Sequence, residues 1–198
     1  MLEQQYLDGR IGSREQALVE TREASSADEA VLQKKGAWAM WMLHNSLGAE
    51  RTFAGLRAFM TEHRAPGRFA TPEGLLRTLR LQASDTIQFD AQVAQWFRST
   101  RLPAFAIDGA RCEQVDRAWS CTAILRNVGT GDAAVDVAAM RGDTVMAGGM
   151  VRVGVGAGKS ASVHWTLPTR PERLVVDPDV MVLQARREQA VARPAPDT

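Results

Sequence analysis

Few residues in this chain could do chemistry, and their spacing excludes the common catalytic arrangements. The three histidines are His44, His63 and His164, and none has a second histidine, a cysteine or an acidic residue at zinc-ligand spacing. There is no H-E-x-x-H, no G-x-S-x-G and no Cys–His pairing signal. We therefore expect no metal ligands in this chain. His63 is expected to be solvated or to cap a helix end, where a cation suits the helix dipole.

The two cysteines, Cys112 and Cys121, are too few for a disulfide scaffold or a structural zinc site. If Asp116-Arg117 forms a two-residue hairpin turn, Cys112 faces Cys121 in a non-hydrogen-bonded pair, where side chains approach most closely. Two outcomes stay open at this point: a disulfide in an oxidising compartment, or two reduced cysteines in the core.

Two short motifs have a simpler reading. Gly156-Ala157-Gly158-Lys159-Ser160 is similar to the end of a phosphate-binding loop, but Val153 stands where the motif needs its first glycine. The residues that follow predict a strand, whereas phosphate binding needs a helix there. Arg141-Gly142-Asp143 matches the integrin tripeptide, and an ordinary β-turn explains it. We expect turns at both places.

The rest of the chain is organised around one predicted helix, over 26–47. Ser26-Ala27-Asp28-Glu29 is a capping box, and Gly48 can take the conformation that ends a helix. Because residues 36–43 hold no charged or polar side chain, this helix is expected to be buried on nearly all sides. Lys34-Lys35 is expected to lie on its polar face, with an anion site as the alternative.

Further elements define the fold class. Helices are predicted over 49–63, after the cap Thr71 with Pro72 in the first turn, and after the cap Asp85. Beyond Leu102-Pro103 the sequence turns to valine, glycine and alternating patterns, which predict short strands. The strand candidates are a hairpin about Asp116-Arg117 and the segments 134–140, 144–155, 160–167 and 173–176. The prediction is an α+β protein: an N-terminal antiparallel helical array, then a small antiparallel β-sandwich.

These elements divide the 198 residues into four parts. They are a polar, weakly held lead-in (1–25), a helical subdomain (26–102), a β-sandwich (103–183) and a tail expected to fray (184–198). Hydrophobic residues make up 45% and charged residues 24%, which predicts a soluble globular protein. The formal net charge of +1 argues against nucleic acid as a partner, and no apolar run is long enough for a membrane span. The N-terminal residues lack the features of a signal peptide, so the sequence indicates no compartment.

The order of several motifs resembles the membrane alanyl aminopeptidase (aminopeptidase N) family of zinc metallopeptidases, family M-one. Gln33-Lys34-Lys35-Gly36-Ala37 looks like the family's Y-x-K-G-A, and Leu47-Gly48-Ala49-Glu50-Arg51-Thr52-Phe53 is similar to its L-G-x-E-x-x-F. Trp96-Phe97 followed by Leu102-Pro103 resembles the exit from the catalytic domain. Two β segments, 126–131 and 174–179, look like the sandwich domain that follows. The resemblance covers about residues 30–180.

The resemblance also shows what this chain lacks. The family's zinc ligands and general base lie upstream, in H-E-x-x-H and a later Glu, and none of them is present here. The family's tyrosine, which stabilises the oxyanion, is replaced by Gln33. A glutamine amide can donate a hydrogen bond, but without a metal-bound water it has nothing to assist. No catalytic or metal-binding residue is therefore assigned, Gln33 marks the tyrosine position, and the substrate-binding residues stay unknown.

Three functional hypotheses remain. In the first, the chain is the C-terminal part of a metallopeptidase-like protein, inactive alone, whose helices complete a peptide-binding cleft beside the zinc-bearing half. In the second, it is a binding or scaffold module derived from such an enzyme. In the third, a separate chain that carries the zinc motif completes the enzyme. The helices over 26–63 are expected to expose an apolar face toward such a partner.

Overall fold

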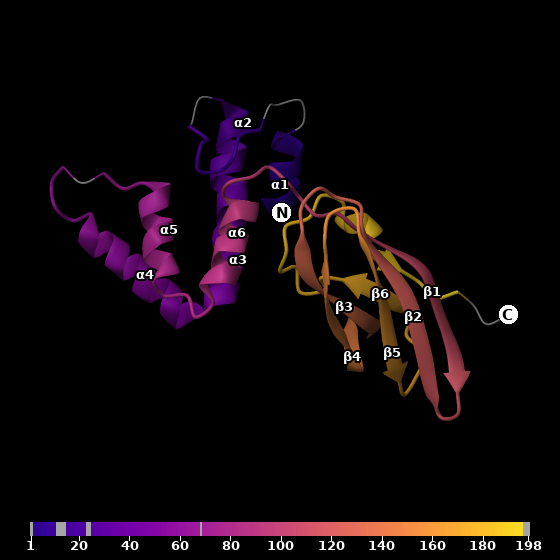
Figure 1. The fold of residues 1–198 in the computed structure, drawn as a ribbon. Coiled ribbons are helices and arrows are strands. Elements are labelled where there is room, and N and C mark those ends of the chain that lie inside the picture. Colours follow the sequence, from indigo (N-terminus) through magenta and orange to yellow (C-terminus); the bar gives the residue numbers. More distant parts are fainter. Residues whose placement is uncertain (1, 11–14, 23–24, 68, 196–198) are drawn as a thin grey trace. The chain divides into compact units, whose positions relative to one another are not determined.

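The computed structural model describes residues 2–10, 15–22, 25–67 and 69–195. The chain forms two compact units, Met1–Thr100 and Arg101–Thr198. The first is helical and the second is built of strands (Figure 1). Helices followed by two antiparallel sheets make this an α+β protein, as the sequence predicts. In the described part of the chain, no helix combines the length and the apolar character that crossing a bilayer requires.

The helical unit begins with α1 (Leu2–Gly9). One continuous helical stretch follows, made of α2 (Ser26–Glu29), a π-helical segment η1 (Ala30–Lys35) and α3 (Gly36–Leu47). The remaining helices are α4 (Ala49–Glu62), α5 (Pro72–Arg80) and α6 (Thr86–Trp96). The predicted helices are confirmed.

Helix caps explain most of these boundaries. The Thr71 hydroxyl accepts the Gly74 N–H at 3.1 Å, and an Asp85 carboxylate oxygen accepts the Gln88 N–H at 2.9 Å. The Ser25 hydroxyl, one residue before the predicted cap, accepts the Asp28 N–H at 3.3 Å. The Ser25 hydroxyl also donates to the Asp28 carboxylate at 2.8 Å, which adds a contact between the two side chains.

The prediction that residues 36–43 are buried on nearly all sides is wrong. Ala39 and Leu43 are buried together with Trp38 and Met42, whereas Ala37 is exposed and Trp41 is 46% exposed. The reason is helical periodicity, since the positions that point away from the packed face stay open whatever their hydrophobicity.

A glycine sets how closely α4 and α5 approach. A Cβ placed on Gly55 would lie 2.8 Å from a methyl carbon of Leu79 and 3.3 Å from the carbonyl oxygen of Thr78. Leu79 is fully buried, so its side chain has little room to move away. The missing side chain at Gly55 therefore permits this helix pair.

The β unit consists of two antiparallel sheets. In the first, β2 (Ala118–Asn127) lies between β1 (Phe105–Val115) and β5 (Ser160–Leu167). The second sheet has four strands, in the order β4 (Thr144–Val155), β3 (Ala133–Arg141), β6 (Arg173–Val176) and β7 (Val191–Ala192). One hydrophobic core joins residues of both sheets, which makes the unit a small sandwich. The core includes Phe105, Leu125, Val137, Trp165, Leu167 and Leu174.

A buried asparagine ties the entry of this unit to a turn. The Asn127 side-chain oxygen accepts the N–H groups of Ala104 and Gly129, at 3.2 and 3.1 Å. Its amide nitrogen donates to the carbonyls of Gly131 and Val155, at 2.8 and 3.0 Å. Asn127 is 1% exposed, and its side-chain amide makes all four of its possible hydrogen bonds. It therefore fixes the local backbone, and the cost of burying its polar atoms is compensated.

The tail differs from the prediction that it frays from residue 184. Strand β7 pairs with β6, where Val175 lies opposite Val191. The Ala195 N–H donates to the Ala110 carbonyl at 3.0 Å. These backbone hydrogen bonds hold the described part of the tail, which its polar composition alone does not indicate.

Candidate functional site

Gln33, which the sequence resemblance aligns with a tyrosine of the metallopeptidase family, lies in the π-helical segment η1. The Gly36 N–H at the end of this segment donates to the Val31 carbonyl, five residues earlier, which is the wider spacing of a π-turn, and also to the Gln33 carbonyl. The Gln33 side chain is exposed, and its amide donates to the Glu29 carboxylate at 3.0 Å. In this structure Gln33 therefore makes a surface contact between two side chains four residues apart.

Lys35, two residues further on, is the centre of a buried polar cluster. Its side chain is fully buried, and its ammonium donates to Glu15 at 2.8 Å and to the Ser99 carbonyl at 2.9 Å. The Tyr6 hydroxyl donates to the same Glu15 oxygen at 2.7 Å, and Arg10 pairs with the other oxygen at 2.6 Å. The prediction that Lys35 lies on the polar face is wrong, because these partners come from other parts of the helical unit and remove the ammonium from solvent.

Burial perturbs two groups of this cluster. Burial lowers the pKa of Lys35, although the hydrogen bond and the charge of Glu15 oppose this shift. Burial, together with the hydrogen bond to Glu15, raises the pKa of Tyr6 far above its ordinary value. The sequence predicts a weakly held lead-in over residues 1–25. In the structure Tyr6 is nevertheless fully buried, and Glu15 is the counter-ion of Lys35. We therefore assign the cluster a structural role in anchoring the first residues.

An aromatic surface, defined here as Trp41, His44 and Phe53, lies on α3 and α4. The rings of Trp41 and His44 stack at 5.9 Å between centroids, and His44 meets Phe53 edge to face at 6.2 Å. Trp41 is 46% exposed and Phe53 53% exposed. The sequence predicts an exposed apolar face over residues 26–63. Trp41 and Phe53 are exposed in agreement with it, whereas Trp38 and Met42 are buried.

The histidines do not form a metal site. Among the residues that the structure describes, no group of three or more His, Cys, Asp and Glu side chains could hold a metal ion. The His63 ring donates from Nδ1 to the Phe59 carbonyl at 2.9 Å, which is the capping role predicted for it. The described residues therefore do not fit the zinc of the metallopeptidase family that the sequence resembles, and no step of a zinc mechanism is assigned to them.

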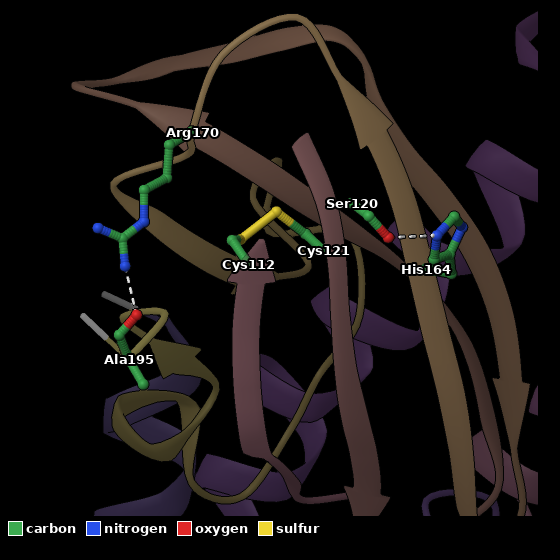
Figure 2. Close-up of a disulfide and its surroundings, with 6 residues drawn as sticks. All are labelled: Cys112, Ser120, Cys121, His164, Arg170 and Ala195. Atoms are coloured by element: carbon green, nitrogen blue, oxygen red, sulfur yellow. Dashed lines mark hydrogen bonds between the residues drawn. A yellow bond between two sulfur atoms is a disulfide. The ribbon is translucent and has the colours of Figure 1, made fainter. Parts of the chain in front are cut away.

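In the β unit, Ser120 and His164 form a pair that sequence reasoning missed. Their side chains lie 3.2 Å apart on the neighbouring strands β2 and β5 (Figure 2). The register of β2 against β5 is the signal that could have revealed this pair. Ser120 lies opposite Thr166, and His164 lies two residues before Thr166 on the same face of the sheet. Among the residues that the structure describes, no carboxylate orients the His164 ring, so the pair lacks the third member of a catalytic triad.

The motif residues 156–160 form a turn, as predicted. The Ala157 N–H donates to Asp132 at 2.7 Å, the Lys159 N–H donates to Gly156 at 3.0 Å, and Ser160 opens strand β5. The strand β5 that follows offers no helix N-terminus to receive a phosphate.

The two cysteines, Cys112 and Cys121, face each other as predicted, with Cα atoms 4.1 Å apart, and the sulfurs form a disulfide (Figure 2). Of the two redox states left open, the structure therefore has the oxidised one.

Comparison with known proteins reveals one extended likeness of fold. No protein-family model matches the sequence, and no curated protein matches it significantly. Legionella pneumophila aminopeptidase A, solved in complex with aspartic acid, superposes with a TM-score of 0.55 at 10% sequence identity. The match covers 92% of this chain and 21% of that enzyme, so the chain corresponds to about a fifth of the enzyme's length. At this identity the likeness is one of fold.

Two further matches cover 46% of the chain. Both are the CARDB domain of a Pyrococcus furiosus protein, one crystallised with di-metal ions and one solved in solution. Their TM-scores are 0.38 and 0.36, at 14% and 15% identity, and they cover 84% and 89% of the domain. Scores this low do not establish a shared fold. Of these three structures, the aminopeptidase alone has a score that supports a likeness of fold, and the likeness is to part of that enzyme.

Proposed function

We propose that this chain is the C-terminal part of an aminopeptidase-like zinc metallopeptidase. It is not catalytic by itself and contributes to a peptide-binding cleft. The observation that carries the proposal is the likeness to Legionella pneumophila aminopeptidase A, which extends over 92% of the chain. The sequence motifs from Gln33 to Asp179 support it independently, since they follow the family's order. In this proposal residues 26–102 end the catalytic domain, and residues 103–183 form the domain after it.

The zinc-bearing half is the partner that this proposal requires. The aromatic surface supports such a partner, because tryptophan and phenylalanine side chains that are about half exposed are enriched at protein interfaces. The described residues supply no metal site of their own, so the zinc ligands and the general base must come from that half. This chain's own contribution is then the wall of the cleft, with Gln33 near the position of the oxyanion.

The second candidate is a non-enzymatic binding or scaffold module derived from such a peptidase. Its specific support is the state of Gln33, whose amide is engaged by Glu29 and is exposed, as expected for an ordinary helix residue. In this alternative the aromatic surface binds a partner that carries no zinc motif.

The two candidates differ in what accompanies the chain in its native cells. The experiment is immunoprecipitation with an antibody against the β unit, followed by intact-mass measurement and peptide sequencing. The proposal predicts H-E-x-x-H peptides in the same polypeptide or in a stoichiometric partner, together with bound zinc. A 21.6 kDa protein without such peptides would instead support the scaffold module.

A further inference from the structure

The β unit contains an arginine-rich cavity of about 570 Å³ that the proposed function does not use. Three segments that are distant in sequence line it: the β3–β4 turn, the residues that lead into β6, and the residues that follow β7. The charged residues of the lining are Arg141, Asp143, Arg170, Glu172, Arg173 and Arg193. Its volume lies within the range of about 300–1,000 Å³ that is typical of small-molecule sites.

The cavity concentrates positive charge. Its four guanidinium groups outnumber its two carboxylates, although the whole chain has a net charge of only +1. Both carboxylates are already engaged within the lining. Asp143 pairs with Arg173 at 2.7 Å, and Glu172 accepts the Gly142 N–H at 2.9 Å. Arg141 also lies 4.0 Å from Glu172. The lining nevertheless has more basic than acidic side chains, which favours an anion as its ligand.

Neighbouring groups hold two of the arginines in place. The Arg170 guanidinium lies over the Trp119 ring, 5.6 Å from its centroid. It also donates to the Ala195 carbonyl (Figure 2). Arg173 donates to the Gly142 carbonyl at 2.9 Å in addition to its ion pair. Side chains fixed in this way lose little further entropy when a ligand binds.

Two donors of the lining point to a ligand. The Nε–H of Arg173 is shielded from solvent and has no hydrogen-bond acceptor in the part of the chain that the structure describes. A shielded donor without an acceptor is costly, and it usually indicates a water or an ion that completes the site. Arg193 is exposed and forms no ion pair with the described residues, so its guanidinium is available as well.

We propose that this cavity binds a small anionic molecule that carries phosphate groups. Guanidinium groups donate hydrogen bonds that match the oxygens of a phosphate, and the Nε–H of Arg173 and the guanidinium of Arg193 supply such donors in one lining. The lining uses residues of the β unit alone, so the site does not depend on the proposed peptidase role.

The test uses the full chain, titrated with inorganic phosphate and with pyrophosphate at constant ionic strength. Nuclear magnetic resonance follows the arginine Nε–H signals and the amides of residues 141–143 and 172–173. Saturable shifts of these signals are expected, with tighter binding of pyrophosphate because it carries more charge. Titration without saturation would overturn the proposal.

Arg193→Gln is the informative variant, because the side chain is exposed and its loss breaks no ion pair with the described residues. Loss of one charge-assisted hydrogen bond is expected to weaken pyrophosphate binding about tenfold. Arg152→Gln is the matched control, since it removes one arginine of the same unit whose partner is Asp136 and which does not line the cavity. Equal weakening by both variants would show a general effect of charge and would overturn the site.

Discussion

The ammonium of Lys35 lies 2.8 Å from the carboxylate of Glu15, and both side chains are shielded from water. The ion pair joins the first residues of the chain to the start of the long helix. A buried ion pair contributes little net stability when it is complete, but removing one partner leaves an uncompensated charge in the interior. Two predictions depend on this relationship.

We expect Glu15→Ala to destabilise the protein by about 3–5 kcal/mol, because it leaves the Lys35 ammonium buried without its counter-ion. Urea unfolding followed by circular dichroism measures the change. Asp90→Ala is the control, since it removes a carboxylate from the exposed pair with Arg80, and little change is expected. The double variant Glu15→Leu/Lys35→Met is expected to lose less than the sum of its single changes. Additive losses would contradict a direct coupling.

The buried Tyr6 makes the stability of the folded protein depend on pH in the alkaline range. Burial raises the pKa of Tyr6 above its ordinary value of 10.0, so above about pH 10 the unfolded chain releases a proton that the folded chain retains. The free energy of unfolding should therefore fall as the pH rises above that value. Tyr6 is the only tyrosine, so ultraviolet absorbance of the phenolate reports this residue alone. Its ionisation should coincide with loss of helical circular dichroism, and a phenolate that forms near pH 10 in the folded protein would refute the prediction.

Gly129→Ala should disrupt the β unit. A Cβ at this position would lie 2.4 Å from the Ala104 nitrogen and 2.4 Å from the Leu102 oxygen, and backbone atoms cannot move aside as a flexible side chain can. We expect a loss of more than about 3 kcal/mol, at the upper end of overpacking effects, measured by urea unfolding. Gly154→Ala is the matched control, because nothing lies within 4 Å of its added Cβ and its backbone is compatible with alanine. Similar losses in both variants would show that the close approach is not the cause.

The disulfide between Cys112 and Cys121 closes a short loop, with a sequence separation of 9. Replacing both cysteines with alanine is expected to cost about 2–3 kcal/mol, as the chain-entropy relation gives for a loop of this length. Thiol titration of the unfolded protein, purified under oxidising conditions, should find no free thiol before reduction and two afterwards. Two reactive thiols before reduction would be incompatible with the bridge.

Gln33 tests the catalytic interpretation. We expect no hydrolysis of aminoacyl chromogenic substrates by the chain, with or without added zinc, and none by Gln33→Tyr. One oxyanion donor contributes about 3–4 kcal/mol to a reaction that must already have its nucleophile, and the described residues hold no metal site to generate one. Metal analysis of dialysed protein should find well under one equivalent of zinc. Zinc-dependent turnover that survives repurification would overturn this interpretation.

The sequence by itself determined the features that depend on neighbouring residues. Thr71 and Asp85 cap their helices because the N–H groups that they accept lie only three residues away. Cys112 faces Cys121 because a two-residue turn fixes the register of its own hairpin. Such hydrogen bonds and pairings form within one element or between adjacent ones, so local residue types suffice to predict them.

Only the tertiary structure decided which polar side chains are buried and which charges meet. Lys35 has the composition of a surface residue, and its burial depends on Glu15, Tyr6 and the Ser99 carbonyl, which come from elsewhere in the chain. The arginine-rich cavity likewise joins three segments that no local pattern relates. The physical reason is that burial and electrostatic interactions depend on distance in space, which the chain fixes only when its elements pack.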